Sequence, residues 1–311
     1  MSALHLALAE YVATRRALGS KFHEPAQALH HFVNFMENQG AEFVTWSLAL
    51  RWAKEPVGVQ PATWSRRLCA VRGFAGWLNA TDARNEIPPK ALLGARHRRP
   101  TPYIYTDQEI EALMAAAGSL RSKTGLRALT HSTIIGLLAS TGMRPGEALA
   151  LEDRDTDLRD GILAVRDTKF GKSRFVPIED STRNALSRYV RHRNRVFPHR
   201  WTDSFLVGEK GHHLTPSVAE RTFAKQSVMI GIRAPGPRFG RGPRLQDLRH
   251  TFATRKLVEW YRADLDVTRL IPRLSTYLGH VSVKETYWYI QAVPELLQCA
   301  TRRRVTHGAG R

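Results

Sequence analysis

Apolar residues in the first hundred positions recur with helical spacing. The pattern i, i+3, i+4, i+7 marks one buried helical face at Leu29, Phe32, Val33 and Met36. Gly40 is the expected stop of this helix. A second helix is expected to begin after a Thr45 cap and to end at Pro56, and a third to run from about Pro61 to Leu78. The N-terminal third is therefore predicted to be helical.

The third of these helices is apolar on one side and basic on the other. Its apolar side carries Trp64, Leu68, Val71, Ala75 and Leu78, and its opposite side carries Arg66, Arg67 and Arg72. Two interpretations of the arginines fit the pattern equally well. They form either a solvated charged face or a face that lies against DNA phosphates.

The helical pattern breaks after Ile87. Pro88 and Pro89 lead into a short basic stretch without core periodicity that contains Arg96, Arg98 and Arg99. Prolines together with like charges favour an extended linker. The charge of the linker is either accidental or that of a connector that crosses a DNA backbone, and Arg96, Arg98 and Arg99 are predicted to contact DNA. We therefore expect a boundary near residues 94–103, with a first domain over 1–95, a basic linker over 96–103 and a second domain over 104–311.

The second domain opens with a helix start at Thr106, followed by acidic residues and then apolar ones. A buried helix is expected over about 133–140. Gly142 can end that helix, and Pro145 can begin the next one in its first turn. Arg144 is therefore predicted to lie on a tight connector between two helices, on a fixed backbone.

Two short strands are predicted in the middle of this domain, over residues 161–165 and 174–178. The turn between them, 167–172, carries lysines near its tip. The rest of the pattern is helical, over about 181–196, 215–231, 247–261, 266–278, 282–290 and 294–304. The expected fold is mainly α with a small antiparallel β-sheet, and no internal repeat is visible.

Charge points to the partner. The 311 residues include 47 Lys and Arg against 28 Asp and Glu, which gives a net charge of +19, and the pI is near 10.6. The excess is spread along the chain, because residues 1–100 carry 13 basic and 7 acidic residues and residues 101–311 carry 34 and 21. Two basic domains fit one long polyanion, which favours a nucleic-acid partner over the alternative of a merely basic enzyme.

Other function classes are less well supported. Hydrophobic residues make up 42% of the chain, yet the apolar runs are far shorter than the ~20 residues of a membrane span. The first residues lack the basic region of a secretory signal. Cys69 and Cys299 are too few for a disulfide framework or a zinc cluster, so a reducing cytoplasm is expected. His212 and His213 are expected in a solvated loop, and no metal or cofactor motif stands out.

An ordered series of motifs carries the chemistry. It consists of Thr-Gly-Met-Arg-Pro-Gly-Glu-Ala-Leu at 141–149, Lys169 on the strand turn, Gln-Asp-Leu-Arg-His-Thr-Phe-Ala-Thr at 246–254, Leu-Gly-His at 278–280 and Glu-Thr-Tyr-Trp-Tyr at 285–289. In order, spacing and flanking residues this series resembles the tyrosine recombinase (phage integrase) family. The resemblance covers nearly all of residues 101–292. It implies a core-binding (SAM-like) DNA-binding domain over 1–95 and a catalytic domain with a C-terminal tail helix over 104–311.

The resemblance assigns two arginines, Arg144 and Arg249, to the scissile phosphate. Attack on a phosphodiester passes through a pentacoordinate state with added charge on the non-bridging oxygens, and guanidinium forks can bind those oxygens at any working pH. A structural alternative is that either arginine pairs with a neighbouring carboxylate, Glu147 or Asp247.

The nucleophile implied by the family spacing is Tyr289, nine residues after His280, and Tyr287 is the competing choice. Tyr289 would displace a 5′-hydroxyl and form a 3′-phosphotyrosyl link. Lys169 would protonate the leaving oxygen, with Lys172 as the near neighbour that is easily confused with it. His280 would hydrogen-bond the phosphate or the oxygen of the nucleophile.

One position departs from the family pattern. The residue three before the second arginine is usually His, and here it is Gln246. An amide can donate a hydrogen bond to phosphate but cannot accept a proton from tyrosine. This departure keeps open an accessory role beside a partner recombinase.

Further basic residues of the second domain are predicted to contact DNA: Lys172, Arg174, Arg238, Arg241 and Arg244. The last three belong to an arginine-rich segment before the second arginine motif, for which a plain surface loop is the alternative. The tail after Tyr289 is expected to form a short helix that packs either on a neighbouring subunit or on its own domain.

The resemblance implies a site-specific recombinase that integrates, excises or transposes a mobile element, needs no cofactor, and works as a homotetramer on DNA in the cytoplasm, associated with the nucleoid. Partner recombinases are an option. The rivals are a type IB topoisomerase-like or telomere-resolving enzyme, and a non-catalytic accessory DNA-binding protein.

Overall fold

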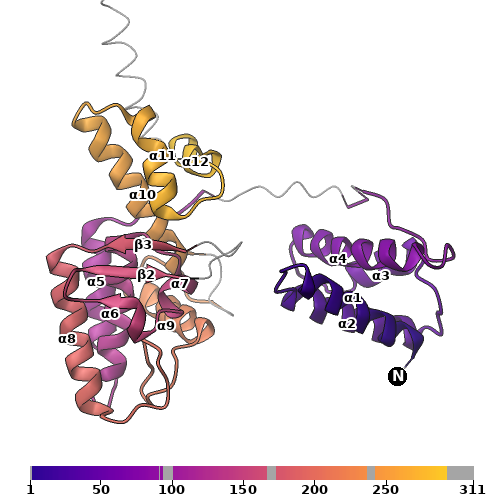
Figure 1. The fold of residues 1–311 in the computed structure, drawn as a ribbon, viewed down its shortest axis with the longest axis horizontal. Helices are drawn as coiled ribbons and strands as arrows, with labels where there is room; N and C mark the ends of the chain where they lie inside the picture. The colour runs from indigo at the N-terminus through magenta and orange to yellow at the C-terminus, as the bar shows by residue number, and fades with distance from the viewer. Residues whose placement is uncertain (1, 91, 94–100, 167–172, 237–241, 293–311) are drawn as a thin grey trace, which may run out of the picture. The chain divides into compact units, whose positions relative to one another are not determined.

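The computed structural model describes residues 2–90, 92–93, 101–166, 173–236 and 242–292 (Figure 1). Contacts divide the chain into two compact units, Met1–Arg99 and Pro100–Arg311, so the division falls inside the expected linker. Several residues singled out above lie outside the described part: Arg96, Arg98, Arg99, Lys169, Lys172, Arg238, Arg241 and Cys299. The expected tail helix over 294–304 also lies outside it.

The described residues of the first unit form a bundle of four helices. These are α1 (Ala3–Ala17), α2 (His23–Asn38), α3 (Trp46–Lys54) and α4 (Pro61–Asn79). Thr45 caps α3 as predicted, because its Oγ1 accepts a hydrogen bond from the amide of Leu48 at 3.3 Å. The predicted apolar face of α2 is confirmed, since Leu29, Phe32, Val33 and Met36 are all fully buried in one cluster with α1, α3 and α4.

The second unit combines a helical body with a small sheet. Its elements are α5 (Asp107–Gly118), α6 (Leu126–Thr141), α7 (Pro145–Leu149), the 3-10 turn η1 (Asp153–Asp155), β1 (Thr156–Asp157), β2 (Ile162–Val165), β3 (Arg174–Pro177), α8 (Asp180–Val196), α9 (Pro216–Met229), α10 (Leu245–Arg262), α11 (Val267–Leu278) and α12 (Lys284–Ala292). The expected fold class, mainly α with a small antiparallel sheet, is confirmed. No helix in the described ranges is long and apolar enough to cross a membrane.

In the part of the chain that the structure describes, the sheet has three strands in the order β1-β2-β3, all antiparallel. Leu163 of β2 lies opposite Val176 of β3, and both side chains are buried in the helical core. The two predicted strands are present. The third, β1, was not predicted because two residues are too few to show an alternating pattern.

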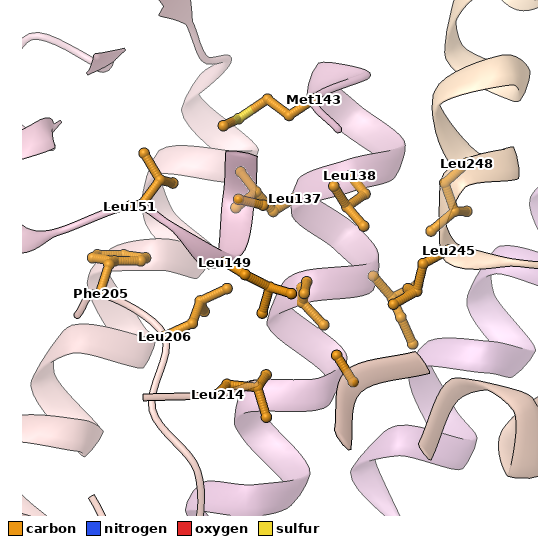
Figure 2. Close-up of a cluster of buried hydrophobic side chains, with 14 of the residues drawn as sticks. Leu137, Leu138, Met143, Leu149, Leu151, Phe205, Leu206, Leu214, Leu245 and Leu248 are labelled. Atoms are coloured by element: carbon orange, nitrogen blue, oxygen red, sulfur yellow. The ribbon is translucent and has the colours of Figure 1, made fainter. Parts of the chain in front are cut away.

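Helix α6 forms the centre of this unit, with α5, α7, α8, α9 and α10 packed around it. Figure 2 shows how apolar side chains from α6, α7, α10 and the intervening loops meet in one core: Leu137, Leu138, Met143, Leu149, Leu151, Phe205, Leu206, Leu214, Leu245 and Leu248. Met143 precedes Arg144 on the connector and is buried in this core, as is Leu149 at the end of α7. The core therefore anchors both the connector and the helix that follows it.

Helices α10, α11 and α12 share a second, smaller cluster. Leu257 of α10, Leu274 and Leu278 of α11 and Tyr289 of α12 are buried in it. This packing holds α12, and with it Tyr289, against α10.

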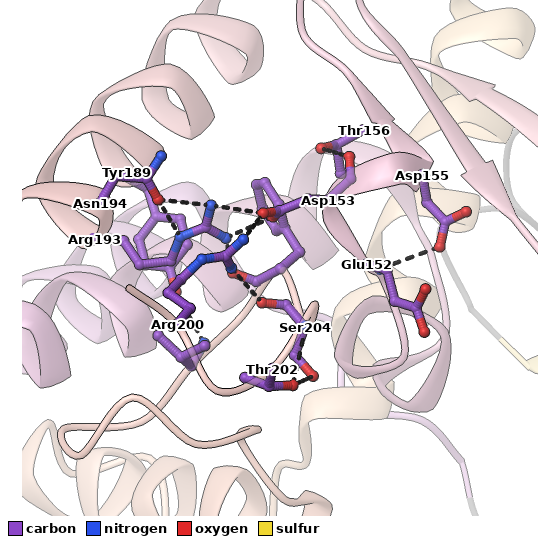
Figure 3. A network of polar contacts seen from close by, with 12 residues as sticks. Glu152, Asp153, Asp155, Thr156, Tyr189, Arg193, Asn194, Arg200, Thr202 and Ser204 are labelled. Atoms are coloured by element: carbon purple, nitrogen blue, oxygen red, sulfur yellow. Dashed lines mark hydrogen bonds and ion pairs between the residues drawn. The ribbon is translucent and has the colours of Figure 1, made fainter. Parts of the chain in front are cut away.

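A polar network joins the start of the sheet to α8 (Figure 3). Both carboxylate oxygens of Asp153 bind the guanidinium of Arg193, at 2.8 and 3.2 Å, and Arg200 binds the same carboxylate. Arg193 also donates to the carbonyl of Phe205 and, twice, to the side chain of Asn194. Because Arg193 is 1% exposed, this network satisfies a buried charge.

Candidate active site

The connector between α6 and α7 presents Arg144 as predicted. Gly142 ends α6 in the left-handed conformation, with φ of 63°, and Pro145 begins α7. A Cβ atom at position 142 would lie 2.4 Å from Cδ1 of Phe252, so only glycine fits there. Arg144 itself has extended dihedrals, φ −70° and ψ 143°, at the N-cap of α7. Its side chain is 33% exposed.

Arg144 makes two side-chain hydrogen bonds. Its Nη1 donates to Oε1 of Glu147 at 2.7 Å, and its Nη2 donates to the backbone carbonyl of Gly279 at 3.1 Å. The alternative of a neighbouring carboxylate partner thus holds for Arg144. A guanidinium has five N–H donors, so this pairing leaves capacity for a further anion.

Glu147 also holds Arg174, which reaches it from β3. The Nη2 and Nη1 atoms of Arg174 donate to the two carboxylate oxygens at 2.7 and 3.1 Å, and its Nε donates to the carbonyl of Tyr277 at 2.8 Å. Burial by itself would raise the pKa of Glu147. The hydrogen bonds and charges of Arg174 and Arg144 outweigh burial and lower that pKa to about 2.

Arg249 lies on α10 and is 1% exposed. Its Nη1 donates to the carbonyl of Gly142 at 3.0 Å, and its Nη2 donates to the carbonyl of Leu278 at 2.7 Å. These carbonyls stand at the C-terminal ends of α6 and α11, where the helix dipole favours a cation. Burial and the nearby charge of Arg144 lower the pKa of Arg249 to about 10, so the side chain remains charged at neutral pH.

Tyr289 lies beside this group of arginines. Its side chain is 1% exposed, and a negative charge on its oxygen would favour the cation of Arg249. The hydroxyl is 3.2 Å from Nδ1 of His250 on α10. Tyr287, the competing nucleophile, is 41% exposed on another side of α12.

His280 follows α11, which Gly279 ends with a φ of 69°. The His280 ring stacks on the Tyr289 ring with 6.1 Å between centroids, and its Nδ1 lies 2.7 Å from Oγ1 of Thr286. The structure therefore brings Arg144, Arg249, His280 and Tyr289 together. Lys169 lies outside the described residues.

The sequence pattern of the phage integrase family matches residues 104–295, more than half of the chain. The chain belongs to the phage integrase family. It is 41% identical over 307 residues to y4rB of Sinorhizobium fredii, a protein named as an integrase/recombinase, with 97% of each chain covered. It is 32% identical over 243 residues to the tyrosine recombinase XerD of Caulobacter vibrioides, covering 77% of this chain and 74% of XerD.

A solved structure supports the fold. The integrase of transposon Tn1549, in complex with transposon right end DNA, superposes with a TM-score of 0.66 at 17% identity and covers 96% of this chain and 98% of that one. As a member of the tyrosine recombinases, the chain is a DNA strand transferase of site-specific recombination and binds DNA. The family prediction made from the motif series is confirmed.

Position 246, where the family pattern has His, lies in the first turn of α10. The Gln246 side chain is half-buried and makes no hydrogen bond among the described residues. The neighbouring Asp247 pairs with Arg244 at 2.9 Å, so Asp247 is not the partner of Arg249. Arg244 remains about half exposed at the start of the helix.

Of the three arginines predicted on one face of α4, two bind their own unit. Arg67 stacks on the Trp52 ring, 3.7 Å from its centroid, and donates to the Trp52 carbonyl at 2.8 Å. Arg72 donates to the carbonyls of Pro88 and Pro89. Arg66 is exposed. These contacts join α4 to α3 and to the segment that follows α4. Contact of the arginine face of α4 with DNA stays a prediction.

Two features of the site were not predicted from the sequence. Arg174 was expected to contact DNA, yet in the structure it turns inward and binds Glu147, with 12% of its side chain exposed. His250 was not singled out, although it follows Arg249 directly and contacts Tyr289. The only available signal was its place in the second motif. His212 and His213 are exposed, and no metal-binding cluster occurs among the described residues.

Proposed function

We propose that this recombinase cleaves DNA through attack of the Tyr289 hydroxyl on a phosphodiester, with formation of a 3′-phosphotyrosyl bond and release of a 5′-hydroxyl. Arg144 and Arg249 bind the non-bridging oxygens, and His280 assists at the same phosphate. Lys169 protonates the leaving oxygen. The energy of the broken bond is kept in the covalent link, so resealing needs no nucleotide.

The observation that carries this proposal is the incomplete hydrogen bonding of the two arginines. Each uses two hydrogen bonds from its guanidinium, which leaves three of its five N–H donors without an acceptor among the described residues. These donors lie in the same site as the Tyr289 hydroxyl. A phosphate offers the oxygens that they lack, and its developing charge is where electrostatic stabilisation has its effect.

The substrate is double-stranded DNA, and the biological role is integration, excision or transposition of a mobile element by a tetramer that exchanges strands in pairs. Support comes from the relative named as an integrase/recombinase and from the likeness to a transposon integrase. The basic residues of both units supply the affinity for the phosphate backbone.

A covalent-trapping assay tests the mechanism. The protein is mixed with nicked duplexes tiled from the DNA that flanks its own gene, in EDTA without ATP, and SDS-resistant protein–DNA bands are quantified. Wild type is expected to form the adduct and Tyr289→Phe to lose it completely. Tyr287→Phe is the matched control and should form the adduct at the wild-type rate, since Tyr287 lies two residues away and is exposed.

Gln246 favours a second candidate function, that of an accessory subunit beside an active partner. Tight DNA binding without any adduct would support that role, and Gln246→His would then be expected to create cleavage. Relaxation of supercoils without junctions between two DNA sites would instead favour a topoisomerase-like activity.

A further inference from the structure

Positions 246 and 250 are neighbours on the same face of α10, because residues four apart on a helix lie one above the other. The histidine that the family usually has at position 246 is absent, and the Gln246 amide cannot accept a proton in its place. One turn further along, an imidazole is present at His250. It is this imidazole that contacts the nucleophile.

The contact between His250 and Tyr289 is enclosed. His250 is 7% exposed, Tyr289 is 1% exposed, and their ring centroids are 5.4 Å apart. The Trp288 ring lies edge-on to the imidazole at 5.7 Å. The 3.2 Å between Nδ1 and the hydroxyl oxygen is within hydrogen-bonding distance of the atom that must lose a proton.

We propose that His250 is the proton acceptor for Tyr289 in strand cleavage and returns that proton in resealing. The inference rests on the proposed phosphotyrosyl mechanism. In cleavage the O–H bond of Tyr289 breaks and its proton moves to Nδ1 of His250, with the ring's own proton on Nε2. The phenolate oxygen forms a bond to phosphorus, the bond from phosphorus to the 5′-oxygen breaks, and that oxygen takes a proton from Lys169. Resealing reverses each transfer.

Charged groups from several elements surround Arg249, the residue next to His250, and Arg249 interacts electrostatically with Tyr289. The connector before α7 supplies Arg144, α7 supplies Glu147 and β3 supplies Arg174, while the His280 ring stacks on Tyr289 from the turn after α11. The arginines favour a phenolate over a neutral phenol. They disfavour a protonated imidazole until a phosphate, which is negative, occupies the site. The geometry thus ties proton transfer to substrate binding.

The test uses His250→Asn, since the asparagine amide sits close to the position of Nδ1 and keeps hydrogen bonding but cannot take a proton. Rates of covalent-adduct formation are measured from pH 5 to 9 on the nicked duplexes described above. The wild-type rate is expected to rise with pH, because His250 must be neutral to accept the proton. His250→Asn is expected to bind DNA normally, to form the adduct about 10²-fold more slowly, and to lose this rise.

A second variant tests whether His250 has only a structural role. In the His250→Asn background, Gln246→His restores an imidazole on the same helical face and is expected to recover part of the rate and the pH-dependent rise. A wild-type rate that does not change with pH over this range overturns the inference without any variant. An adduct whose rate and pH dependence are unchanged in His250→Asn overturns it too, while leaving the phosphotyrosyl mechanism intact. Absence of a Tyr289-dependent adduct in wild type overturns both.

Discussion

Two carboxylates in the second unit each hold a pair of arginines. Asp153 binds Arg193 and Arg200 at the end of α8, and Glu147 binds Arg144 and Arg174 beside α7. The Asp153 cluster joins secondary-structure elements. The Glu147 cluster adds a third guanidinium, that of Arg249, whose charge interacts with those of Arg144 and Glu147.

The two clusters differ in the hydrogen bonding of their most buried arginine, although the burial of that arginine is the same in both. Arg193 and Arg249 are both 1% exposed, yet within the described ranges Arg193 makes five side-chain hydrogen bonds and Arg249 makes two. A guanidinium with all its donors satisfied is complete within the fold. A guanidinium with unused N–H donors can bind an external anion. The number of unused donors therefore distinguishes a structural arginine from a substrate-binding one.

The largest effect is expected when Arg249, whose guanidinium has unused donors, is replaced by lysine. Arg249→Lys removes the fork that binds two oxygens, and we expect adduct formation to slow by about 10³-fold, equivalent to about 4 kcal/mol of transition-state stabilisation. Single-turnover trapping measures the rate. The matched control is Arg193→Lys, which should lower stability and leave the rate per folded molecule unchanged. A rate for Arg249→Lys within tenfold of wild type would contradict the comparison.

A smaller effect is expected at the complete cluster. Asp153→Asn leaves the buried charge of Arg193 without its anion, and the free energy of unfolding should fall by about 3 kcal/mol. Urea denaturation followed by circular dichroism measures this change. Arg154→Ala, which alters an exposed ion pair with Glu152 next to the cluster, should change stability by less than about 1 kcal/mol. Equal effects of the two substitutions would show that the network does not stabilise the fold.

The third effect depends on pH and concerns Glu147. Because folding lowers its pKa from 4.5 to about 2, the carboxylate stabilises the fold fully above pH 4.5, and this contribution is lost as the pH falls toward 2. Glu147→Gln should therefore reduce stability by roughly 3 kcal/mol at neutral pH and by progressively less below pH 4.5. Urea titrations at several pH values measure the difference between the two proteins. A difference that stays constant with pH would mean that the charge of Glu147 is not what matters.

Local patterns predicted much of this molecule. The connector at Arg144 follows from Gly142 and Pro145, whose backbone preferences act within a few residues. The inward turn of Arg174 could not be predicted, because it depends on Glu147, 27 residues earlier in the chain. Alternation along β3 does not show which of its neighbours holds a countercharge.

The contact of His250 with Tyr289 was beyond prediction for the same reason. It joins positions 39 residues apart through the packing of α12 on α10. The motifs place His250 next to the second arginine and contain Tyr289 as the nucleophile. They carry no information on whether these two side chains meet. Such pairings depend on helix orientation, which is set by the apolar cluster that the three final helices share.

The two hydrogen bonds of Arg249 bear on how such a protein can diverge. By binding the carbonyls of Gly142 and Leu278, this one side chain ties the ends of α6 and α11 to α10. A descendant that no longer cut DNA would still gain from keeping that tie, so genetic drift should erode other positions first. Gln246, half-buried and without a hydrogen bond in the described part of the chain, is the kind of position where exchange is tolerated. In this architecture, an arginine retained at the position of Arg249 is therefore weak evidence that a relative cuts DNA.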